Sequence, residues 1–352
     1  MDAAEGPTRV ISSVAPIRIS DFGGWTDTWF AKYGKVLNIA VYPYAEAQVQ
    51  VFPRGDRAPV EIHAENYGER YTLDRVGGVY DRHPLLEAAL DYMGVPKDLA
   101  LNISIFSEAP AGCSTGTSAA VSVALIGALD RLTPGRLTPH EIARAAHRIE
   151  TDLLGQQCGV QDQLASAYGG INFIEILNYP DSIVSPILLP NTVHWELERR
   201  LSLIFLGQSH SSSRVHEKVI EELENAGPDA AKLQPLRETP VKARDALFAG
   251  DFVALGQAMI ANSEAQANLH AELVSPTHQA VIDVAKEFDA LGWKINGAGG
   301  DGGSVTVLGN SDTSRKREML RAMEESVPGT KHIPIYLSRF GVRLWDSPLE
   351  ER

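Results

Sequence analysis

The segment APAGCSTGTSAAVSVALIGAL, residues 109–129, limits how this chain can fold more than any other part of the sequence. Before it, apolar residues alternate with polar ones over 101–105, a pattern that predicts a β-strand. Gly, Ser and Thr then dominate 112–118, and a nearly unbroken apolar run without a charge follows over 119–129. Because a helix that is apolar on all sides has to be buried, the segment predicts a strand, a soft loop and a core helix in succession.

A loop in this position places free backbone N–H groups and the positive end of the helix dipole at one point. Such a point binds anions, phosphate above all. The hydroxyl groups of Thr117 and Ser118 can donate to phosphate oxygens or bind Mg²⁺. The loop is not a Walker A motif, which requires GxxxxGK[ST]. Taken alone, it is explained equally well as a polar turn with Thr117 or Ser118 as the N-cap.

Composition and charge exclude several classes of protein. The 352 residues, 44% hydrophobic and 22% charged, suffice for two packed domains of a soluble protein. The apolar run over 119–129 is about half as long as a membrane-spanning helix. A formal charge of −13 without a Lys/Arg cluster speaks against a nucleic acid partner. Cys113 and Cys158 form no CxxC pair, which indicates reduced thiols, and the N-terminus lacks a secretory pattern, so we expect a cytoplasmic protein.

The remaining pattern divides the chain into a strand-rich first part and a helix-rich second part. Alternation predicts strands of a mostly antiparallel sheet over 10–13, 36–43, 45–52 and 60–64. Helical spacing predicts helices over 84–93, 141–154 (with Thr138 as N-cap), 214–225, 243–248, 252–261 and 278–291. Further strands are predicted over 201–206 and in SVTVL and HIPIYLSRFGVRLW. The prolines of NYPDSIVSPILLPNT place a boundary between about 180 and 200, and two α+β lobes result.

Three further segments carry reactive or flexible residues, although each has a plain structural explanation by itself. APIRISDFGGWTD holds Arg18 and Asp27 around a glycine pair, as in a strand followed by a capped turn. ETDLLGQQCGVQDQLASAYGGIN holds Glu150 and Asp162, the second in a typical N-cap position. KINGAGGDGGSV, which begins at Lys294, is so rich in glycine that it indicates a tight turn or a closely approaching ligand.

Together with the opening loop, these segments resemble the GHMP family of small-molecule kinases, named for galactokinase, homoserine kinase, mevalonate kinase and phosphomevalonate kinase. PAGCSTGTSAA is similar to the family's PxGxGLxSSAA phosphate loop, and KINGAGGDGG is similar to its C-terminal KxxGAGGGG loop. The E-x4-G-x2-C-G-x2-D spacing from Glu150 to Asp162 is similar to that of galactokinases, and so is the separation of Arg18 from Asp27. The four segments keep the family's order over nearly the whole chain.

The resemblance implies an α+β fold with two lobes, the GHMP kinase fold. Its N-terminal lobe is expected to be like domain 2 of ribosomal protein S5, and its C-terminal lobe to be ferredoxin-like. The implied division is an ATP-binding domain over residues 1–190 and a C-terminal domain over residues 191–352.

The resemblance also implies roles for single residues, with ATP and Mg²⁺ as cofactors. Asp162 is expected to accept the proton of the attacking hydroxyl, and Arg18 to pair with it or with the transferring phosphoryl group. The metal is expected on Ser118 and Glu150. The implied ATP-binding residues are Pro110, Gly112, Ser114, Thr115, Gly116, Thr117, Ser118, Gly297 and Gly299. The implied substrate contacts are Gly24, Trp25, Thr26, Asp27, Asp162, Gly170, Asn172 and Arg214.

Structural explanations stay open beside several of these roles. Trp25 can equally be a core tryptophan, and Asn172 a turn residue that satisfies its own backbone. Arg214 and His210, in GQSHSSSRVHEK, are candidates for contact with a substrate phosphate, but a solvated loop and a helix N-cap explain that stretch as well.

The run VQDQLASAYGGIN, with APIRIS and GG-x-TD, resembles heptose kinases that phosphorylate D-glycero-D-manno-heptose 7-phosphate at the anomeric position. GGWTDT also resembles L-fucokinases. The implied reaction is phosphoryl transfer from ATP to the anomeric hydroxyl of a sugar or sugar phosphate, with L-fucokinase, galactokinase or uronic acid kinase activity as alternatives. A catalytically silent sugar and nucleotide sensor is an alternative of another class, and a decarboxylase is a third. No nucleic acid or membrane partner is expected, and a homodimer is left open.

Two positions depart from the family's pattern. Ser114 and Thr115 stand where the family has glycine and, usually, leucine, which stiffens the loop. Asp301 interrupts the C-terminal glycine loop and places a carboxylate near the expected phosphates, where like charges repel. We therefore expect both positions to influence nucleotide binding.

Overall fold

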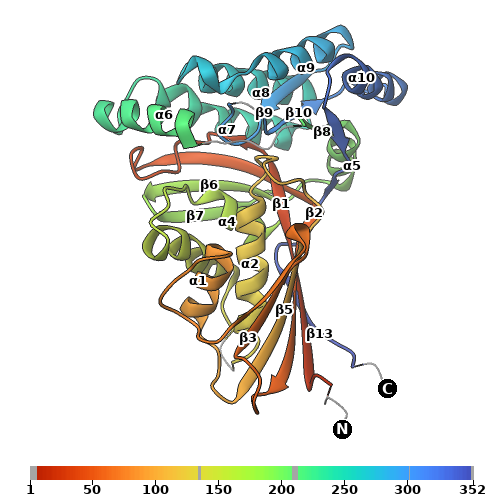
Figure 1. Cartoon of the computed structure of the whole chain (residues 1–352). Coiled ribbons are helices and arrows are strands. Elements are labelled where there is room, and N and C mark those ends of the chain that lie inside the picture. The colour runs from red at the N-terminus through yellow and green to blue at the C-terminus, as the bar shows by residue number, and fades with distance from the viewer. Residues whose placement is uncertain (1–5, 134–135, 208–212, 301, 350–352) are drawn as a thin grey trace.

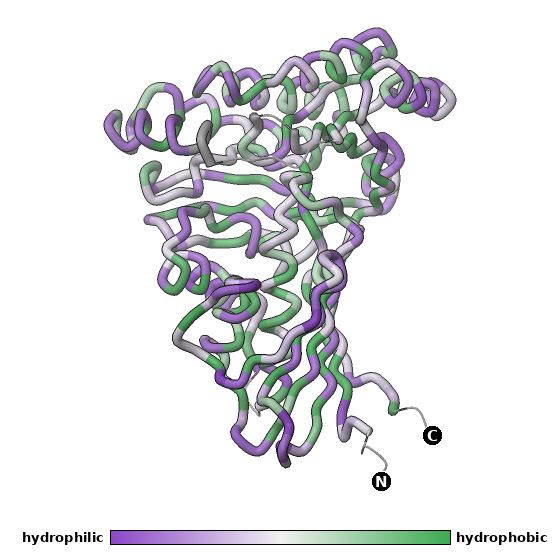
Figure 2. Tube along the Cα trace, in the orientation of Figure 1, coloured by the Kyte–Doolittle hydropathy of each residue, from purple (hydrophilic) through white to green (hydrophobic). Residues whose placement is uncertain are grey.

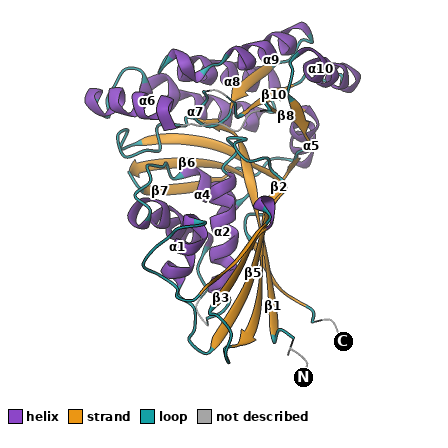
Figure 3. Cartoon of the chain, viewed as in Figure 1, coloured by secondary structure: helices purple, strands orange, loops and turns teal. Residues whose placement is uncertain are grey.

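The computed structural model describes residues 6–133, 136–207, 213–300 and 302–349. Two sheets and the helices that cover them make up this part of the chain (Figures 1 and 3). The larger sheet and its helices form the lower part of the view in Figure 1, and the smaller sheet with its helices lies above them.

The larger sheet has nine strands within the described ranges, in the main order β13–β1–β2–β5–β3–β4. Strands β6 and β12 also pair with β2, and β7 pairs with β6. These strands are β1 (Arg9–Phe22), β2 (Gly34–Pro53), β3 (Val60–Ala64), β4 (Glu69–Leu73), β5 (Leu99–Ser107), β6 (Ile171–Asn178), β7 (Asp181–Pro186), β12 (Tyr336–Leu337) and β13 (Arg343–Ser347). Every pair is antiparallel except β3 with β5, so the predicted mostly antiparallel sheet is confirmed.

The two strands predicted over 36–43 and 45–52 are one long strand, β2. Its first part pairs with β6 and its last part with β5. The pairing with β1 shifts register between Pro16 and Ile17, where the partners change from Tyr44 to Val41. Pro43 lies at that shift, where a residue without an N–H is tolerated, and so the proline does not end the strand.

Four helices accompany the larger sheet: α1 (Pro84–Met93), α2 (Thr117–Asp130), α3 (Pro139–Arg148) and α4 (Gln161–Tyr168). Helix α2 is the predicted core helix, buried from Ala119 onward except at Val121, and Figure 1 shows it running along the sheet. Thr138 caps α3 through a capping box with Glu141, as predicted. The predicted helix over 141–154 is α-helical only to Arg148 and continues as one π-helical turn, Ile149–Leu153.

The smaller sheet has the order β11–β8–β10–β9. Its strands are β8 (Leu201–Phe205), β9 (Gly292–Ile295), β10 (Ser304–Leu308) and β11 (Lys331–Ile333). The surrounding helices are α5 (Asn191–Arg200), α6 (Ser213–Ala226), α7 (Leu233–Ala249), α8 (Phe252–Ala267), α9 (Pro276–Glu287) and α10 (Thr313–Ser326). Helix α7 begins well before the predicted start at residue 243. The prediction was too short because Pro240, a residue that normally ends a helix, lies in the interior of this one.

The segment predicted as a boundary between 180 and 200 contains regular structure. Strand β7 lies there and pairs on one side with β6 only, and α5 begins at Asn191. Proline is tolerated at the ends of such an edge strand, which is why Pro180 and Pro186 can flank it. The division at residue 190 remains a proposal, since β12 and β13 from the end of the chain join the larger sheet.

The core lies between the sheets and their helices. Hydrophobic and hydrophilic residues alternate along the lower strands of the larger sheet in Figure 2, and the burial of β5 alternates in the same way. A second cluster packs α6 and α7 against the loop between β1 and β2, which includes Trp25 and Phe30. Among the described residues, none of the helices combines the length and the apolar character that crossing a bilayer takes.

Candidate active site

The loop between β5 and α2 has the predicted strand–loop–helix form. Gly112 and Gly116 have positive φ angles of 73° and 70°, and Ser114 joins them at 57°. Gly116 is the N-cap of α2, whose first turn holds no acidic residue. The free N–H groups of that turn make this loop suited to a phosphate group.

A cavity of about 140 Å³ lies beside this loop and collects predicted residues from all four segments. The strand β1 and the loop after it, the start of α2, the π turn, α4 and the C-terminal glycine loop all contribute to its wall. The predicted site residues that line it are Arg18, Gly24, Trp25, Asp27, Ser118, Glu150, Asp162 and Gly297. Residues distant in sequence thus meet where the resemblance placed an active site.

Arg18 and Asp162 form a two-pronged ion pair in the wall of the cavity. Arg18 Nε donates to Asp162 Oδ1 at 2.8 Å, and Nη2 donates to Oδ2 at 3.2 Å. The third guanidinium nitrogen, Nη1, donates to the carbonyl oxygen of Ser114 at 2.5 Å. Burial opposes the charge of Arg18, but Asp162 and Asp21 outweigh it and raise its pKa. The side chain of Asp162 is 30% exposed while that of Arg18 is 5% exposed, so the carboxylate is the partner that an incoming hydroxyl group can reach.

Asp27 is a buried residue of the cavity lining, and its carboxylate Oδ2 accepts the backbone N–H of Gln161 at 3.0 Å. Burial raises the pKa of Asp27 to about 6, and the charges of Asp162 and Asp21 add to the rise against that hydrogen bond. Gly159 lies so close that a Cβ there would stand 2.1 Å from Asp27 Oδ2. A side chain at 159 would therefore collide with the carboxylate.

Glu150 and Ser118 supply oxygen atoms to the same cavity. Glu150 lies in the π turn after α3, and its Oε1 accepts the side-chain amide of Gln163 at 2.8 Å. Burial raises the pKa of Glu150 to about 7, and the charge of Asp162 adds to the rise while the Gln163 bond works against it. The described residues contain no group of three or more His, Cys, Asp and Glu side chains that could hold a metal ion.

An aromatic wall, formed by Trp25, Trp29 and Phe30, faces the cavity from the loop between β1 and β2. Trp25 has a φ of 75°, unusual for a bulky residue. Arg237 of α7 holds the end of this loop, because its guanidinium donates to the carbonyl oxygens of Ala31 and Tyr33. It also donates to the carbonyl oxygen of Pro228, between α6 and α7. The second lobe therefore sets the position of the aromatic wall.

Other predicted site residues are not part of the lining of this cavity. Thr26 donates to the carbonyl oxygen of Gly23 within its own turn and to that of Lys35 in β2. Gly170 and Asn172 take part in the larger sheet: the Ala40 N–H donates to the Gly170 carbonyl, and Asn172 Nδ2 donates to the Gly169 carbonyl at 2.9 Å. The predicted ATP-binding residues that do not line it are Pro110, Gly112, Ser114, Thr115, Gly116, Thr117 and Gly299.

Three of the residues considered in the sequence analysis lie next to or outside the described parts of the chain. Arg214 lies in the first turn of α6, the helix whose Ile220 lines the cavity. His210 and Asp301 lie outside the described residues. Their proposed influence on substrate and nucleotide stays a prediction.

Asp21 lines the cavity but was not among the predicted site residues. It follows Arg18 by three positions, and its carboxylate meets Lys294 and the backbone of Gly297. The available signal was a carboxylate three residues after Arg18 in the same strand, at a position that belongs to none of the family's motifs named above.

Known proteins that are similar to this chain are kinases. Residues 83–170 match the model of the GHMP kinases N terminal domain. A D-glycero-alpha-D-manno-heptose 7-phosphate kinase of Campylobacter jejuni is 27% identical over 330 residues, which cover 90% of this chain and 94% of the relative. A mevalonate kinase of Thermococcus onnurineus is 32% identical over 314 residues, which cover 84% of this chain and 87% of the relative.

Among solved structures, a D-glycero-D-manno-heptose 1-phosphate kinase from Bacteroides thetaiotaomicron has a TM-score of 0.74 at 23% identity, and the match covers 95% of this chain and 98% of that one. This likeness confirms the predicted two-lobed α+β fold. GHMP kinases are phosphotransferases that use ATP as the phosphate donor, and the chain belongs to the GHMP kinase family.

Proposed function

We propose that this kinase transfers the γ-phosphoryl group of ATP to the anomeric hydroxyl group of a sugar or sugar phosphate, with D-glycero-D-manno-heptose 7-phosphate as the first candidate. The observation that carries the proposal is the Arg18–Asp162 pair in the wall of a cavity that Asp27 also lines. The similarity to a heptose 7-phosphate kinase over 90% of the chain supports the choice of substrate.

In this proposal Asp162 accepts the proton of the attacking hydroxyl group. Its carboxylate is held by both prongs of Arg18, which fixes the direction in which its oxygens face. Arg18 is almost fully buried, so its charge acts in a medium of low dielectric constant, where it can stabilise the charge that develops during transfer. The pair thus combines proton acceptance with charge stabilisation at one point.

The loop before α2 is proposed to hold the phosphates of ATP through its backbone N–H groups, with Gly297 and Gly299 closing from the second lobe. Ser118 and Glu150 fit a Mg²⁺ ion in their chemistry, since both present oxygen atoms to the cavity and Mg²⁺ commonly takes one or two ligands from protein. When bound, Mg²⁺ neutralises phosphate charge during transfer. Glu150 is buried, and the bond from Gln163 goes to its Oε1 only. The carboxylate can therefore accept further contacts.

The acceptor is proposed to lie against Asp27 and the aromatic wall. A carboxylate can accept two neighbouring hydroxyl groups of a sugar, and an indole ring can stack on the apolar face of one. Gly24 has no room for a side chain, because a Cβ would stand 2.9 Å from Asp21 Oδ2. Glycine at this position therefore adds no side chain to the lining of the cavity.

The test is to incubate the protein with Mg-ATP and separate acceptors: the heptose 7-phosphate, L-fucose, galactose and uronic acids. ADP release identifies an acceptor, and phosphorus NMR of the product identifies the oxygen that was phosphorylated. Asp162→Asn is the control, and it is expected to keep ATP binding while losing at least about a hundredfold in kcat. Turnover of no sugar, or phosphorylation at another oxygen, would contradict the proposal.

A silent sensor of sugar and nucleotide is the competing function. It predicts a broken catalytic set, whereas Arg18, Ser118, Glu150 and Asp162 all line one cavity. If the protein binds ATP and a sugar but releases no ADP above the level of the Asp162→Asn variant, the sensor is the better description.

A further inference from the structure

Asp21 is a buried carboxylate of the cavity wall to which the mechanism above gives no task. It lies near the end of β1 and is 2% exposed. Both of its oxygens accept the N–H of Gly297, at 3.2 and 3.1 Å. Its Oδ1 also lies 3.4 Å from Lys294 Nζ and 4.0 Å from Arg18 Nη1. One carboxylate therefore meets two cations and a peptide of the opposite lobe.

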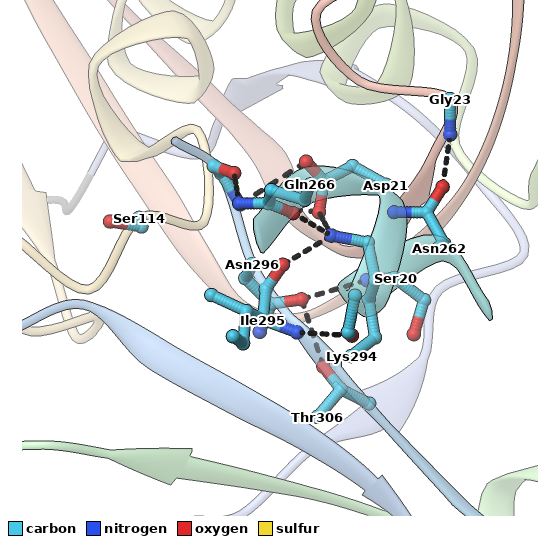
Figure 4. Close-up of polar contacts among 12 residues, drawn as sticks. Ser20, Asp21, Gly23, Ser114, Asn262, Gln266, Lys294, Ile295, Asn296 and Thr306 are labelled. Carbon is cyan, nitrogen blue, oxygen red and sulfur yellow. Dashed lines mark hydrogen bonds and ion pairs between the residues drawn. The ribbon is translucent and has the colours of Figure 1, made fainter. Parts of the chain in front are cut away.

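Lys294 carries a buried ammonium group and is only 1% exposed. Figure 4 shows it among its polar contacts. Its Nζ donates to Gln266 Oε1 at 2.9 Å and to the carbonyl oxygen of Ile295. Burial lowers the pKa of Lys294, and the nearby charge of Arg18 lowers it further, whereas Asp21 opposes both. A buried charge is costly unless it is paired, so Asp21 is the counter-ion that makes this lysine tolerable.

The backbone of Gly297 is held through both its N–H group and its carbonyl oxygen. Its N–H donates to Asp21, and its carbonyl oxygen accepts Gln266 Nε2 at 2.9 Å. Gly297 also packs tightly on the phosphate loop, since a Cβ there would stand 3.0 Å from Ser114 Cβ and 3.1 Å from its carbonyl oxygen. That same Ser114 oxygen accepts Arg18 Nη1. The glycine loop, the phosphate loop and Arg18 thus form one closed set of contacts.

The chain on both sides of Asp21 is tied to the second lobe as well. The N–H of Ser20 donates to Asn296 Oδ1 at 3.0 Å, and the N–H of Gly23 donates to Asn262 Oδ1 at 2.7 Å (Figure 4). Asp21 therefore stands on a backbone that cannot shift freely, and its carboxylate has one defined position.

From these contacts we propose that Asp21 is a positioning residue for phosphoryl transfer. Its buried carboxylate holds the Gly297 peptide against the phosphate loop and, with Lys294 as the second cation, keeps the guanidinium of Arg18 in place for Asp162. The inference rests on the proposed roles of Arg18 and Asp162, and it adds a residue that acts through them. It does not touch the substrate.

The physical basis is the sharing of one negative charge by two buried cations. Without the charge of Asp21, Lys294 would keep only uncharged acceptors among its contacts, Gln266 and Ile295. Arg18 would keep Asp162 and the Ser114 oxygen but would lose its second carboxylate neighbour. Arg18 would then be held from the side of Asp162 and Ser114 only, so its guanidinium, and the carboxylate paired with it, would be less well fixed whether or not Lys294 carries a charge.

Asp21→Asn separates charge from shape, because asparagine keeps an oxygen that can accept the Gly297 N–H. We expect this variant to have a lower Tm and a kcat at least about tenfold lower, since misplacing a catalytic group by a fraction of an ångström is enough for such a loss. The KM for ATP should rise, because only one of the two oxygens that accept the Gly297 N–H remains and it carries no charge. The double variant Asp21→Asn/Lys294→Gln removes both buried charges.

The double variant decides between positioning and simple charge balance. The proposal predicts that it recovers at least half of the lost Tm, while its kcat stays within about threefold of the single variant. Recovery of kcat together with Tm would overturn the proposal, because Asp21 would then serve only to neutralise Lys294. A single variant whose kcat is within threefold of the wild type would overturn it too. If the single variant does not fold, the kcat of the double variant alone decides.

Glu87→Gln is the matched control. Glu87 is also a buried carboxylate, 4% exposed, and it accepts the Tyr71 hydroxyl group at 2.9 Å far from the cavity lining. It should lower Tm without changing kcat. All kinetics use whichever acceptor the wild-type protein turns over, so a missing heptose activity counts against the proposed substrate and leaves the test of Asp21 intact.

Discussion

Replacing Ser114 by glycine tests whether the phosphate loop is held in a strained backbone conformation. Ser114 has a φ of 57°, in the left-handed region. An L side chain there costs roughly 1–2 kcal/mol. Glycine avoids that cost, but it lowers the free energy of unfolding by about 0.4–1 kcal/mol because it gives the unfolded chain more conformational freedom. We therefore expect Ser114→Gly to stabilise the protein by about 0.5–1 kcal/mol, a rise in Tm of about 2 °C for a chain of this size.

The comparison with alanine makes the prediction sharper. Ser114→Ala keeps the strained φ, so the glycine variant should be the more stable of the two by about 1 kcal/mol. Ser122 of α2 is the control, since it lies in a helix interior, where glycine is less stable than alanine by about 1 kcal/mol. The order of the two substitutions should therefore reverse between the two serines.

Urea and thermal unfolding measure the four variants, and steady-state kinetics accompany them. The bond from Arg18 goes to the backbone oxygen of residue 114, so the Ser114→Gly variant should keep kcat within about threefold of the wild type. If Ser114→Ala is as stable as Ser114→Gly, or more so, the loop is not strained at this position and the reasoning is wrong.

Three further predictions concern the acceptor side of the cavity. Gly159→Ala should raise the acceptor KM at least about tenfold, because the new Cβ would stand 2.1 Å from Asp27 Oδ2. Gly155→Ala meets nothing within 4 Å but has a φ of +62°, so it should lower stability and leave that KM nearly unchanged. Asp27 has a folded pKa of about 6 against an ordinary 3.8, so the folded state binds more protons between about pH 4 and 6. Stability should fall as pH rises through that window, by roughly 3 kcal/mol in all, and unfolding of Asp27→Asn should lack this slope. Arg237→Gln should raise the acceptor KM and leave the KM for ATP unchanged, because Arg237 holds the aromatic loop by donating to the carbonyl oxygens of Ala31 and Tyr33. Equal changes in both constants would argue against this role.

Local motifs explain why Arg18 and Asp162 could be selected from the sequence. Each lies in a short motif that resembles one of the family's, and the structure joins the two side chains at 2.8 Å. The strand–loop–helix form of the phosphate loop could also be predicted, because a strand, glycines and an apolar helix are local features of the sequence. The cap of α3 by Thr138 followed from a side chain three residues away.

Long-range contacts explain what could not be predicted. Asp21 gains its role from Lys294 and Gly297, which lie far along the chain and come close only through pairing of segments from both lobes. Asn172 looked like a turn residue of the pocket but lies in β6, where strand pairing with β2 decides its place. The strand β6 itself was missed, since its burial depends on that pairing rather than on an alternating pattern.

The position of β13 beside β1 bears on how the protein could be cut and rejoined. Val10 lies opposite Ser347 in the larger sheet, so the described ends of the chain run next to each other, as Figure 1 shows. A fragment ending at residue 190 would lack β12 and β13 and would leave an edge of β1 open to aggregation. A circular permutant that joins the two ends by a short linker and opens at residue 190 would instead carry each sheet in one uninterrupted stretch. The two lobes could then be expressed, labelled or exchanged as separate units.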